Sequence, residues 1–197
     1  YQKILKPKFS IKAAPGNTKD VSDSDTRISV DNVYSIDRIS SADTIEGGLS
    51  ITYGNDFTIF DKKGSREILE FKLANNLRFD ENENLPKNNS IGQKTSDIFS
   101  EIKYSPNQYI STKYSTAIKN NLTDINYENL TTEFKVNNFV TTFDYLNENN
   151  TQDKDSYLTN TTKFTIDDSN NIVFETRENK SSDITEYYKL MYQYKND

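Results

Sequence analysis

Apolar and polar residues alternate with a period of two along most of this chain, and this feature constrains its fold more than any other. The clearest stretch runs from Thr44 to Phe60. Its apolar parity holds Ile45, Leu49, Ile51, Tyr53, Phe57 and Ile59, and its other parity holds Glu46, Ser50, Thr52, Asp56 and Thr58. Because successive side chains of a β-strand point to opposite faces, the alternation predicts strands with one apolar and one polar face.

The same alternation recurs in nine further segments, separated by turn-like stretches rich in Gly, Asn, Asp and Lys. Their apolar positions are Leu5, Phe9 and Ile11; Leu69, Phe71, Leu73, Leu77 and Phe79; Ile98, Ile102 and Tyr104; Ile110, Tyr114 and Ile118; Leu130, Phe134 and Val136; Phe139, Phe143 and Tyr145; Leu158, Phe164 and Ile166; Ile172 and Phe174; and Tyr188, Leu190, Tyr192 and Tyr194. We therefore predict an all-β fold of about ten meandering antiparallel strands, as in a fragment of a transmembrane β-barrel.

The composition fits strands that are wet on one side. Only 33% of the residues are hydrophobic, which is low for a conventional buried core, yet 13 Tyr and 11 Phe argue against disorder. Transmembrane strands alternate between lipid-facing and lumen-facing residues, so they are hydrophilic on average while they cross a bilayer. A soluble antiparallel sheet with one face on a core gives a similar pattern and stays open as an alternative.

Several classes of chemistry are disfavoured by what the sequence lacks. With no Cys and no His, it offers no thiol nucleophile, no ordinary zinc site and no histidine base. A net charge of −6 disfavours nucleic acid as a partner. The triad Asp20, Asp23 and Asp25 lacks the turn glycine and distal acid of a calcium loop, so we expect a solvated loop. We expect no catalysis, no cofactor and no metal centre. Divalent ions that bridge these acids to anionic lipid head groups are the alternative for this cluster.

The lengths of the connections suggest an orientation in a membrane. The expected connections alternate between long and short, and outer-membrane barrels have long extracellular loops and short periplasmic turns. This predicts that residues 15–43 and 80–94 lie outside the cell and that residues 61–64, 106–107 and 168–170 face the periplasm. Tyrosines near strand ends, namely Tyr104, Tyr109, Tyr157 and Tyr194, are expected to form an aromatic girdle.

Charged side chains on the polar parity are the candidates for lining a barrel lumen. Two polar residues, Asn75 and Glu186, fall on the apolar parity instead. The charge of Glu186 would be tolerated only near the membrane surface. The candidate lumen-lining residues are Glu46, Lys72, Arg78, Glu101, Lys103, Lys113, Glu133, Lys135, Asp144, Lys163, Glu175, Arg177 and Lys189. Their expected general role is hydration and cross-strand pairing.

Three groups of residues carry a likeness to a known family. The first joins Ile4–Ser10 and Asp31–Asp43 to Glu46-Gly47-Gly48, and its most specific element is the string Ile36, Asp37, Arg38 and Ile39. The second is Asn137–Thr141 with Asp144-Tyr145, and the third is Thr185–Tyr188 leading to Tyr194–Asp197. In this order along the chain, the three groups resemble the C-terminal barrel of the LptD family, which assembles lipopolysaccharide in the outer membrane.

The resemblance implies a large single-chain barrel in the bacterial outer membrane that delivers lipopolysaccharide to the outer leaflet. The implied partners are lipopolysaccharide, outer-membrane lipid, an LptE-type lipoprotein plug and periplasmic bridge proteins. The chain opens at Tyr1 without an initiator Met. We therefore expect residues 1–197 to form one partial outer-membrane β-barrel domain, an interior segment of a longer chain. A generic porin or adhesin barrel is the alternative within the membrane class.

Overall fold

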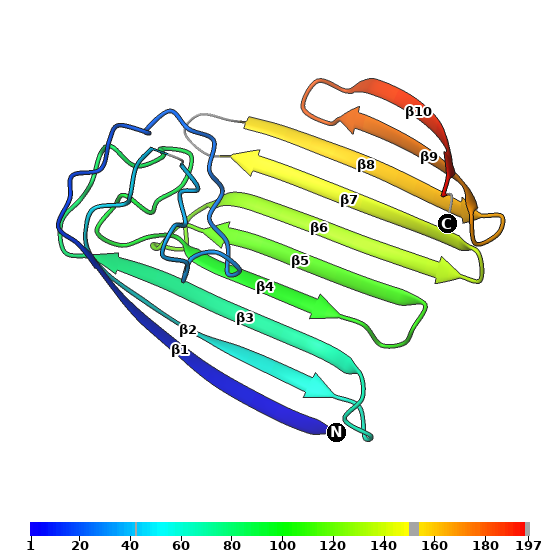
Figure 1. Ribbon diagram of the computed structural model, residues 1–197, viewed down its shortest axis with the longest axis horizontal. Helices are drawn as coiled ribbons and strands as arrows, with labels where there is room; N and C mark the ends of the chain where they lie inside the picture. Colours follow the sequence, from blue (N-terminus) through cyan, green and yellow to red (C-terminus); the bar gives the residue numbers. More distant parts are fainter. Residues whose placement is uncertain (42, 150–153, 196–197) are drawn as a thin grey trace.

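Ten strands form one antiparallel sheet in a computed structural model that describes residues 1–41, 43–149 and 154–195. The strands are β1 (Gln2–Ala14), β2 (Gly48–Phe60), β3 (Glu67–Arg78), β4 (Ile98–Tyr104), β5 (Ile110–Ile118), β6 (Ile125–Val136), β7 (Phe139–Asn149), β8 (Lys154–Thr165), β9 (Asn170–Asn179) and β10 (Ile184–Tyr194). Each strand pairs with its neighbours in sequence, as Figure 1 shows. No helix in the described part of the chain is long and apolar enough to span a membrane.

The predicted meander of ten antiparallel strands is confirmed, and the sheet has two open edges, β1 and β10. Closure into a barrel and passage through a membrane stay predictions. The strand expected from Thr44 begins later, at Gly48, because Glu46 is held in a charge cluster beneath the preceding loop. Ala42, Asn196 and Asp197, which belong to the strings of the family resemblance, lie outside the described residues.

The strand register places most residues of the two predicted parities on opposite faces. One face, hereafter the polar face, carries cross-strand pairs such as Asp56 with Lys72 and Lys72 with Glu101. The opposite face, hereafter the apolar face, carries pairs such as Phe57 with Phe71. Large side chains on the apolar face are uncovered, including Phe9 and Leu190 at 66% and 72% exposure. An exposed apolar face of this extent requires an apolar environment or a partner.

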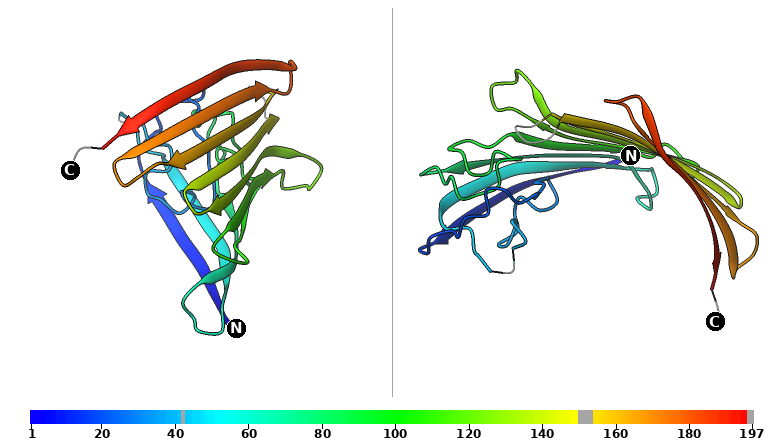
Figure 2. Two further views of the ribbon diagram at one scale, coloured as in Figure 1. Left: turned by 90° about the vertical axis from the view of Figure 1, so that its right-hand side faces the viewer. Right: turned by 90° about the horizontal axis from the view of Figure 1, so that it is seen from above.

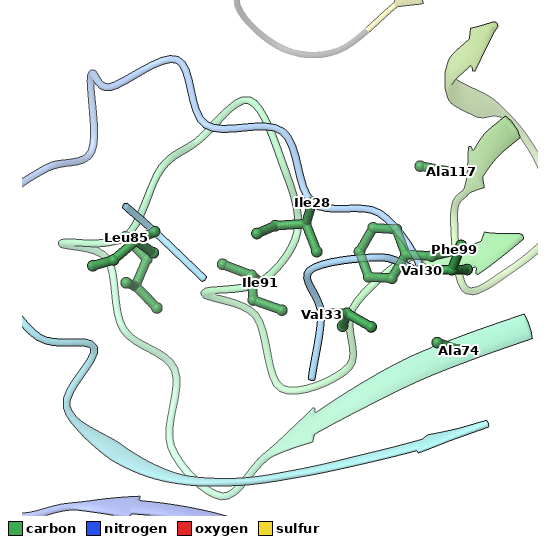
Figure 3. Close-up of a cluster of buried hydrophobic side chains, with 9 residues drawn as sticks. Ile28, Val30, Val33, Ala74, Leu85, Ile91, Phe99 and Ala117 are labelled. Atoms are coloured by element: carbon green, nitrogen blue, oxygen red, sulfur yellow. The ribbon is translucent and has the colours of Figure 1, made fainter. Parts of the chain in front are cut away.

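The buried core of the molecule lies on the polar face, not on the apolar one. Two long connections, the first loop (residues 15–47) and the second loop (residues 79–97), leave the same end of the sheet, and Figure 2 shows the first loop on the inner side of the curved sheet. Figure 3 shows their side chains packed together against the strands. The cluster consists of Ile28, Val30, Val33 and Ile39 from the first loop, Leu85 and Ile91 from the second, and Ala74, Phe99 and Ala117 from β3, β4 and β5. The loops therefore supply most of the core.

The connections follow the predicted long and short rhythm only in part. A meander places alternate connections at opposite ends, so residues 61–66, 105–109, 137–138 and 166–169 lie at the end away from the two long loops. Near the C-terminal end, residues 166–169 and 180–183 form connections of equal length, so the expected alternation is wrong there. The connection between β7 and β8 lies outside the described residues. The two ends of the sheet nevertheless differ, because both long loops leave from one of them.

A local irregularity explains Glu186, one of the two residues that broke the predicted parity. Glu186 is the extra residue of a β-bulge, because Thr185 pairs with Glu178 and Tyr187 pairs with Arg177. Its carboxylate lies 2.9 Å from Arg177 Nε as a close ion pair, so it does not stand on the apolar parity. The Asn75 amide is buried and donates to the backbone oxygens of Ser96 and Asp97.

Three of the four tyrosines of the predicted girdle lie at one end of the sheet, and the girdle itself stays a prediction. Tyr104, Tyr109 and Tyr194 are exposed and lie at the end of the sheet opposite the long loops. The position predicted for Tyr157 is wrong, because the register places this residue on the polar face. There the Arg177 guanidinium lies 4.0 Å from the centre of its ring. Leu158, its neighbour in β8, occupies the apolar face instead.

Candidate functional site

A buried arginine at the end of the first loop is the centre of the candidate site. Arg38 is 2% exposed, and its Nε and Nη2 donate to the two carboxylate oxygens of Glu46 at 2.6 and 2.5 Å. This bidentate arrangement matches the planar guanidinium to the planar carboxylate. The turn that contains Arg38 is fixed by Asp37, whose carboxylate accepts the backbone N–H of Ser40 at 3.1 Å. Ile39, buried in the loop core, anchors the chain on the other side of Arg38.

The remaining donors of Arg38 reach the strands below the loop. Nη1 donates to the Asn76 side-chain oxygen and to the Val33 carbonyl, both at 3.0 Å, and Nη2 donates to Ser50 Oγ at 3.2 Å. Asn76 also accepts from Thr52 at 3.0 Å. Every edge of the guanidinium is thus paired, which offsets the cost of burying its charge.

Glu46 faces three cations. Besides Arg38, Arg78 of β3 donates to its carboxylate, and Lys12 Nζ of β1 lies 3.0 Å from it. Arg78 Nη2 also donates to the Gly47 carbonyl at 2.5 Å. Burial alone would raise the pKa of Glu46, but the hydrogen bonds and charges of Arg38, followed by those of Lys12, outweigh burial and lower that pKa below its ordinary value. The carboxylate therefore stays ionised and ties the first loop to two strands, β1 and β3.

Other contacts carry the first loop across the sheet. Arg27 forms an ion pair with Glu148 of β7, and its guanidinium lies 4.3 Å from the centre of the Tyr127 ring on β6. Asp31 lies 3.3 Å from Lys72 Nζ of β3. With the Lys12 contact at β1, the first loop spans the polar face from β1 to β7. The first loop therefore covers this part of the polar face.

The second loop packs beside the first. The backbone of Val21 donates to Asn84 at 2.9 Å, and that of Lys87 donates to Ser22 at 3.0 Å. All three acids of the triad are exposed, as expected for a solvated loop, while Asp20 caps the Ser22 N–H and Asp25 accepts from Asn88 at 2.7 Å. The hydrogen bonds from the Ser22 backbone and side chain lower the pKa of Asp20.

The four residues of the family motif separate into two roles. Arg38 and Ile39 are buried, the first in the charge cluster and the second in the loop core. Asp37 is exposed and caps the turn, and Ile36 is 83% exposed. The sequence pointed to these four residues as a unit, but gave no sign that the arginine would bind Glu46.

The thirteen candidate lumen-lining residues lie on or beneath a single face, the polar face. Glu46, Arg78 and Glu101 are buried under the loops, and Glu101 lies 3.2 Å from Lys72 and 3.5 Å from Lys113. Those on β6 to β10 lie beyond the loop core, where strand pairs such as Glu175 with Lys189 define the face. That group consists of Glu133, Lys135, Asp144, Lys163, Glu175, Arg177 and Lys189, and Lys103 lies on β4. Whether any of them lines a lumen stays a prediction.

Sequence reasoning missed several members of the cluster. Lys12, Ser50, Thr52 and Asn76 were not among the candidates, although all four lie on the polar parity. A signal was available, since Ser50 and Thr52 are small polar residues that share the parity of Glu46 and would leave room for a side chain packed on the strand. What the parity could not give was the position of the loop that supplies Arg38.

Comparison with known proteins adds a family to this geometry. The family model of LptD, described as LPS transport system D, matches residues 1–182, which include the whole charge cluster and the strands from β1 to β9. The chain belongs to the LptD family. This LptD-family membership connects the chain with lipopolysaccharide transport and with the outer membrane, where proteins of the family act. No curated protein matches the sequence.

Proposed function

We propose that this LptD-family chain forms part of the wall of an outer-membrane translocon that inserts lipopolysaccharide into the outer leaflet. The observation that carries the proposal is the family match over residues 1–182, which covers nearly the entire sheet. The reaction is transport without covalent chemistry. Lipopolysaccharide is the cargo, and an LptE-type lipoprotein and periplasmic bridge proteins are the partners.

The two-faced sheet supports this function. A strand in lipid must satisfy its backbone hydrogen bonds with other strands, and each strand from β2 to β9 is paired on both sides. The apolar face would contact lipid and the polar face would line the lumen. The thirteen candidate residues would then hydrate the interior, with the first and second loops closing it from the extracellular side.

The polar face of β6 to β10 beyond the Arg27 contacts with Tyr127 and Glu148 offers a place for the plug. This surface carries side chains of both charges together with several Thr and Asn residues. For example, Thr131 donates a hydrogen bond to Asp144 at 2.6 Å. A polar surface of this kind fits a partner inside a wet lumen. An LptE-type lipoprotein is the occupant that family membership favours.

Depletion of the full-length protein tests the transport function. We expect less lipopolysaccharide at the cell surface, measured by accessibility to an impermeant label, while the uptake of small solutes changes little at first. Unchanged surface lipopolysaccharide together with altered solute uptake would favour a generic porin. Recovery of the full-length protein in the soluble fraction would exclude both membrane functions and favour a soluble β domain.

Single cysteines test the orientation, since the chain has none of its own. Thr123→Cys lies in the exposed β5–β6 turn, at the end of the long loops, and Lys63→Cys lies in the exposed β2–β3 turn at the other end. In intact cells, an impermeant maleimide should label Thr123→Cys only, against a background from which other cysteines of the full-length protein have been removed. Labelling of Lys63→Cys alone would reverse the orientation.

A further inference from the structure

A cavity of about 600 Å³ lies at the end of the sheet from which the first and second loops leave. Its walls come from the second loop, from the β5–β6 turn (residues 119–124), and from Asn149 and Lys154, where β7 ends and β8 begins. Figure 1 shows this end of the sheet on the left. The volume falls within the range of about 300 to 1,000 Å³ that is usual for ligand pockets.

The chemistry of the lining is unusual for a pocket of this size. Each of the fourteen described residues that line the cavity is polar or charged, and seven of them are Asn or Gln. Most ligand pockets are instead lined mainly by hydrophobic and aromatic side chains. An acyl chain therefore finds no favourable surface among these residues, whereas a ligand covered with hydroxyl groups finds hydrogen-bond partners on all sides.

Asp97 supplies a buried carboxylate to this lining. The residue is only 4% exposed, and its Oδ2 accepts a hydrogen bond from Asn126 Nδ2 at 2.8 Å. Within the part of the chain that the structure describes, no cation forms an ion pair with this carboxylate and no other side chain donates to it. The second loop fixes its backbone, because the Asp97 N–H donates to Ser90 Oγ. Since a buried carboxylate is costly unless hydrogen-bond donors surround it, Asp97 has capacity for a further donor from a ligand.

A β-bulge brings Asn126 to this carboxylate. Asn126 is the extra residue of β6, because Ala117 pairs with Tyr127 whereas Ile118 pairs with Ile125. Bulges re-aim a side chain out of the regular alternation and are frequent beside functional sites. A side-chain amide has two N–H donors, of which one is used on the carboxylate. The pair therefore offers an acceptor and a donor side by side, which matches hydroxyl groups that both donate and accept.

We propose that this cavity binds a sugar unit of lipopolysaccharide through neighbouring hydroxyl groups, with Asp97 as acceptor and Asn126 as donor. The inference rests on the proposed transport function, in which lipopolysaccharide is the cargo and this end of the sheet lies outside the cell. The saccharide part of the cargo is the ligand, and the lipid anchor is not, because the described lining is polar. Three lysines in the lining outnumber its two aspartates, so the cavity also suits a sugar with an acidic substituent.

Calorimetric titration of the full-length protein in detergent tests this site. The probe is the soluble saccharide that remains when the lipid anchor is removed from lipopolysaccharide, and we expect the unaltered protein to bind it. Asp97→Asn should weaken this binding about tenfold, because a hydrogen bond to a charged acceptor becomes one to a neutral acceptor. Asp23→Asn makes the same substitution at an exposed position outside the cavity and should change nothing.

A second variant blocks the cavity without changing a buried residue. Asn120 lines the cavity from the exposed β5–β6 turn, so Asn120→Trp should fill part of the space and weaken saccharide binding by about tenfold or more. Lys63→Trp, in an exposed turn at the far end of the sheet, is the matched control and should have no effect. Undiminished binding in Asn120→Trp overturns the proposal even if Asp97→Asn fails to fold. Absence of saccharide binding by the unaltered protein overturns it as well.

The remaining outcomes distinguish the sugar site from a metal site and from the transport function. Calcium chloride is titrated alone, since carboxylate and amide oxygens also suit Ca²⁺. Calcium binding that Asp97→Asn abolishes, without any saccharide binding, overturns the sugar site. A photocrosslinking amino acid at Thr161, on the polar face of β8, reports contact with intact lipopolysaccharide. Crosslinking there without saccharide binding overturns the sugar site alone, and the absence of both overturns the transport function as well.

Discussion

At the scale of single residues, the charge cluster depends on geometry that only arginine provides. Arg38 binds two oxygens of Glu46 in parallel and still reaches Asn76 and Ser50 with its other edges. A lysine ammonium is a point charge with three donors and cannot form the bidentate pair. Arginine therefore joins the loop to two strands at once.

Removing Arg38 should destabilise the protein strongly. Arg38→Ala leaves the buried Glu46 with fewer partners, and breaking a buried ion pair costs about 3 to 5 kcal/mol. Arg38→Lys should recover only part of that loss. Equilibrium unfolding of the full-length protein in urea measures the change, with Lys63→Ala at an exposed turn as the control. A change of the same small size in Arg38→Ala and Lys63→Ala would contradict the buried role of the arginine.

The cluster should also give stability a defined dependence on pH. Because the folded-state pKa of Glu46 is lowered, its contribution is fully present above the ordinary value of 4.5 and is lost as the pH falls through the folded-state value. The groups that face the carboxylate are the cationic side chains of Lys12, Arg38 and Arg78. Unfolding free energies measured between about pH 3 and pH 7 should fall less steeply in Glu46→Gln. Parallel curves for the two proteins would show that Glu46 is not the group responsible.

At the scale of elements, the first loop packs closely on the strand beneath it at the position of a glycine. The register places Gly54 of β2 on the polar face, and a Cβ atom there would overlap the Leu73 carbonyl oxygen and the Tyr34 hydroxyl. The Tyr34 ring lies 5.4 Å from Lys8 Nζ, and no described residue forms a hydrogen bond with its hydroxyl. The loop thus approaches the strand as closely as the backbone permits.

Substituting this glycine should loosen the loop. Gly54→Ala is expected to cost about 1 to 3 kcal/mol of stability through overpacking. Gly16→Ala, where a Cβ atom meets nothing within 4 Å, serves as the control. Tyr34→Phe should keep or raise stability, because it removes a buried hydroxyl without a partner. Urea unfolding and protease sensitivity of the first loop measure both effects, and a neutral Gly54→Ala would refute the close approach.

The strands were predictable from sequence and the loops were not, for a physical reason. Alternation such as that of Leu49, Ile51 and Tyr53 is a local property, so it fixed the faces of the ten strands. The loop core joins Val33 to Leu85 and Phe99, which are distant in sequence and follow no period. The bulge at Glu186 shifts the pairing by one residue, and no local pattern marks such a shift.

At the scale of the whole molecule, one sheet carries two environments on its faces. The core beneath the loops is small, and large apolar side chains cover the opposite face. In the proposed function this face contacts lipid, so the cost of a charge should depend on which face receives it.

Two neighbouring positions of β3 test this difference. Phe71→Arg places a charge on the apolar face and should cost about 2 to 4 kcal/mol near the centre of a bilayer. Lys72→Arg keeps a charge on the polar face and should cost little. Folding of the full-length protein into lipid vesicles, followed as a function of urea, measures both. Equal costs would contradict the assignment of the faces.

The 197-residue chain by itself should associate with further copies in water. Both edges, β1 and β10, have unpaired backbone groups. Exposed side chains such as Phe9 and Leu190 also make the apolar face prone to hydrophobic association. Light scattering should detect large particles that detergent reduces in size. A monodisperse monomer in water would instead support a soluble β domain.

The span of the first loop across the polar face has a consequence for the order of folding. The hairpins from β4 to β10 are joined by short connections, so their closure costs little chain entropy. The connection between β1 and β2 is the long segment 15–47. In the folded protein this segment contacts Tyr127 on β6 and Glu148 on β7, so its ordering depends on those strands. We therefore expect the sheet to grow from its C-terminal strands towards β1, with the pairing of β1 and β2 as the last step.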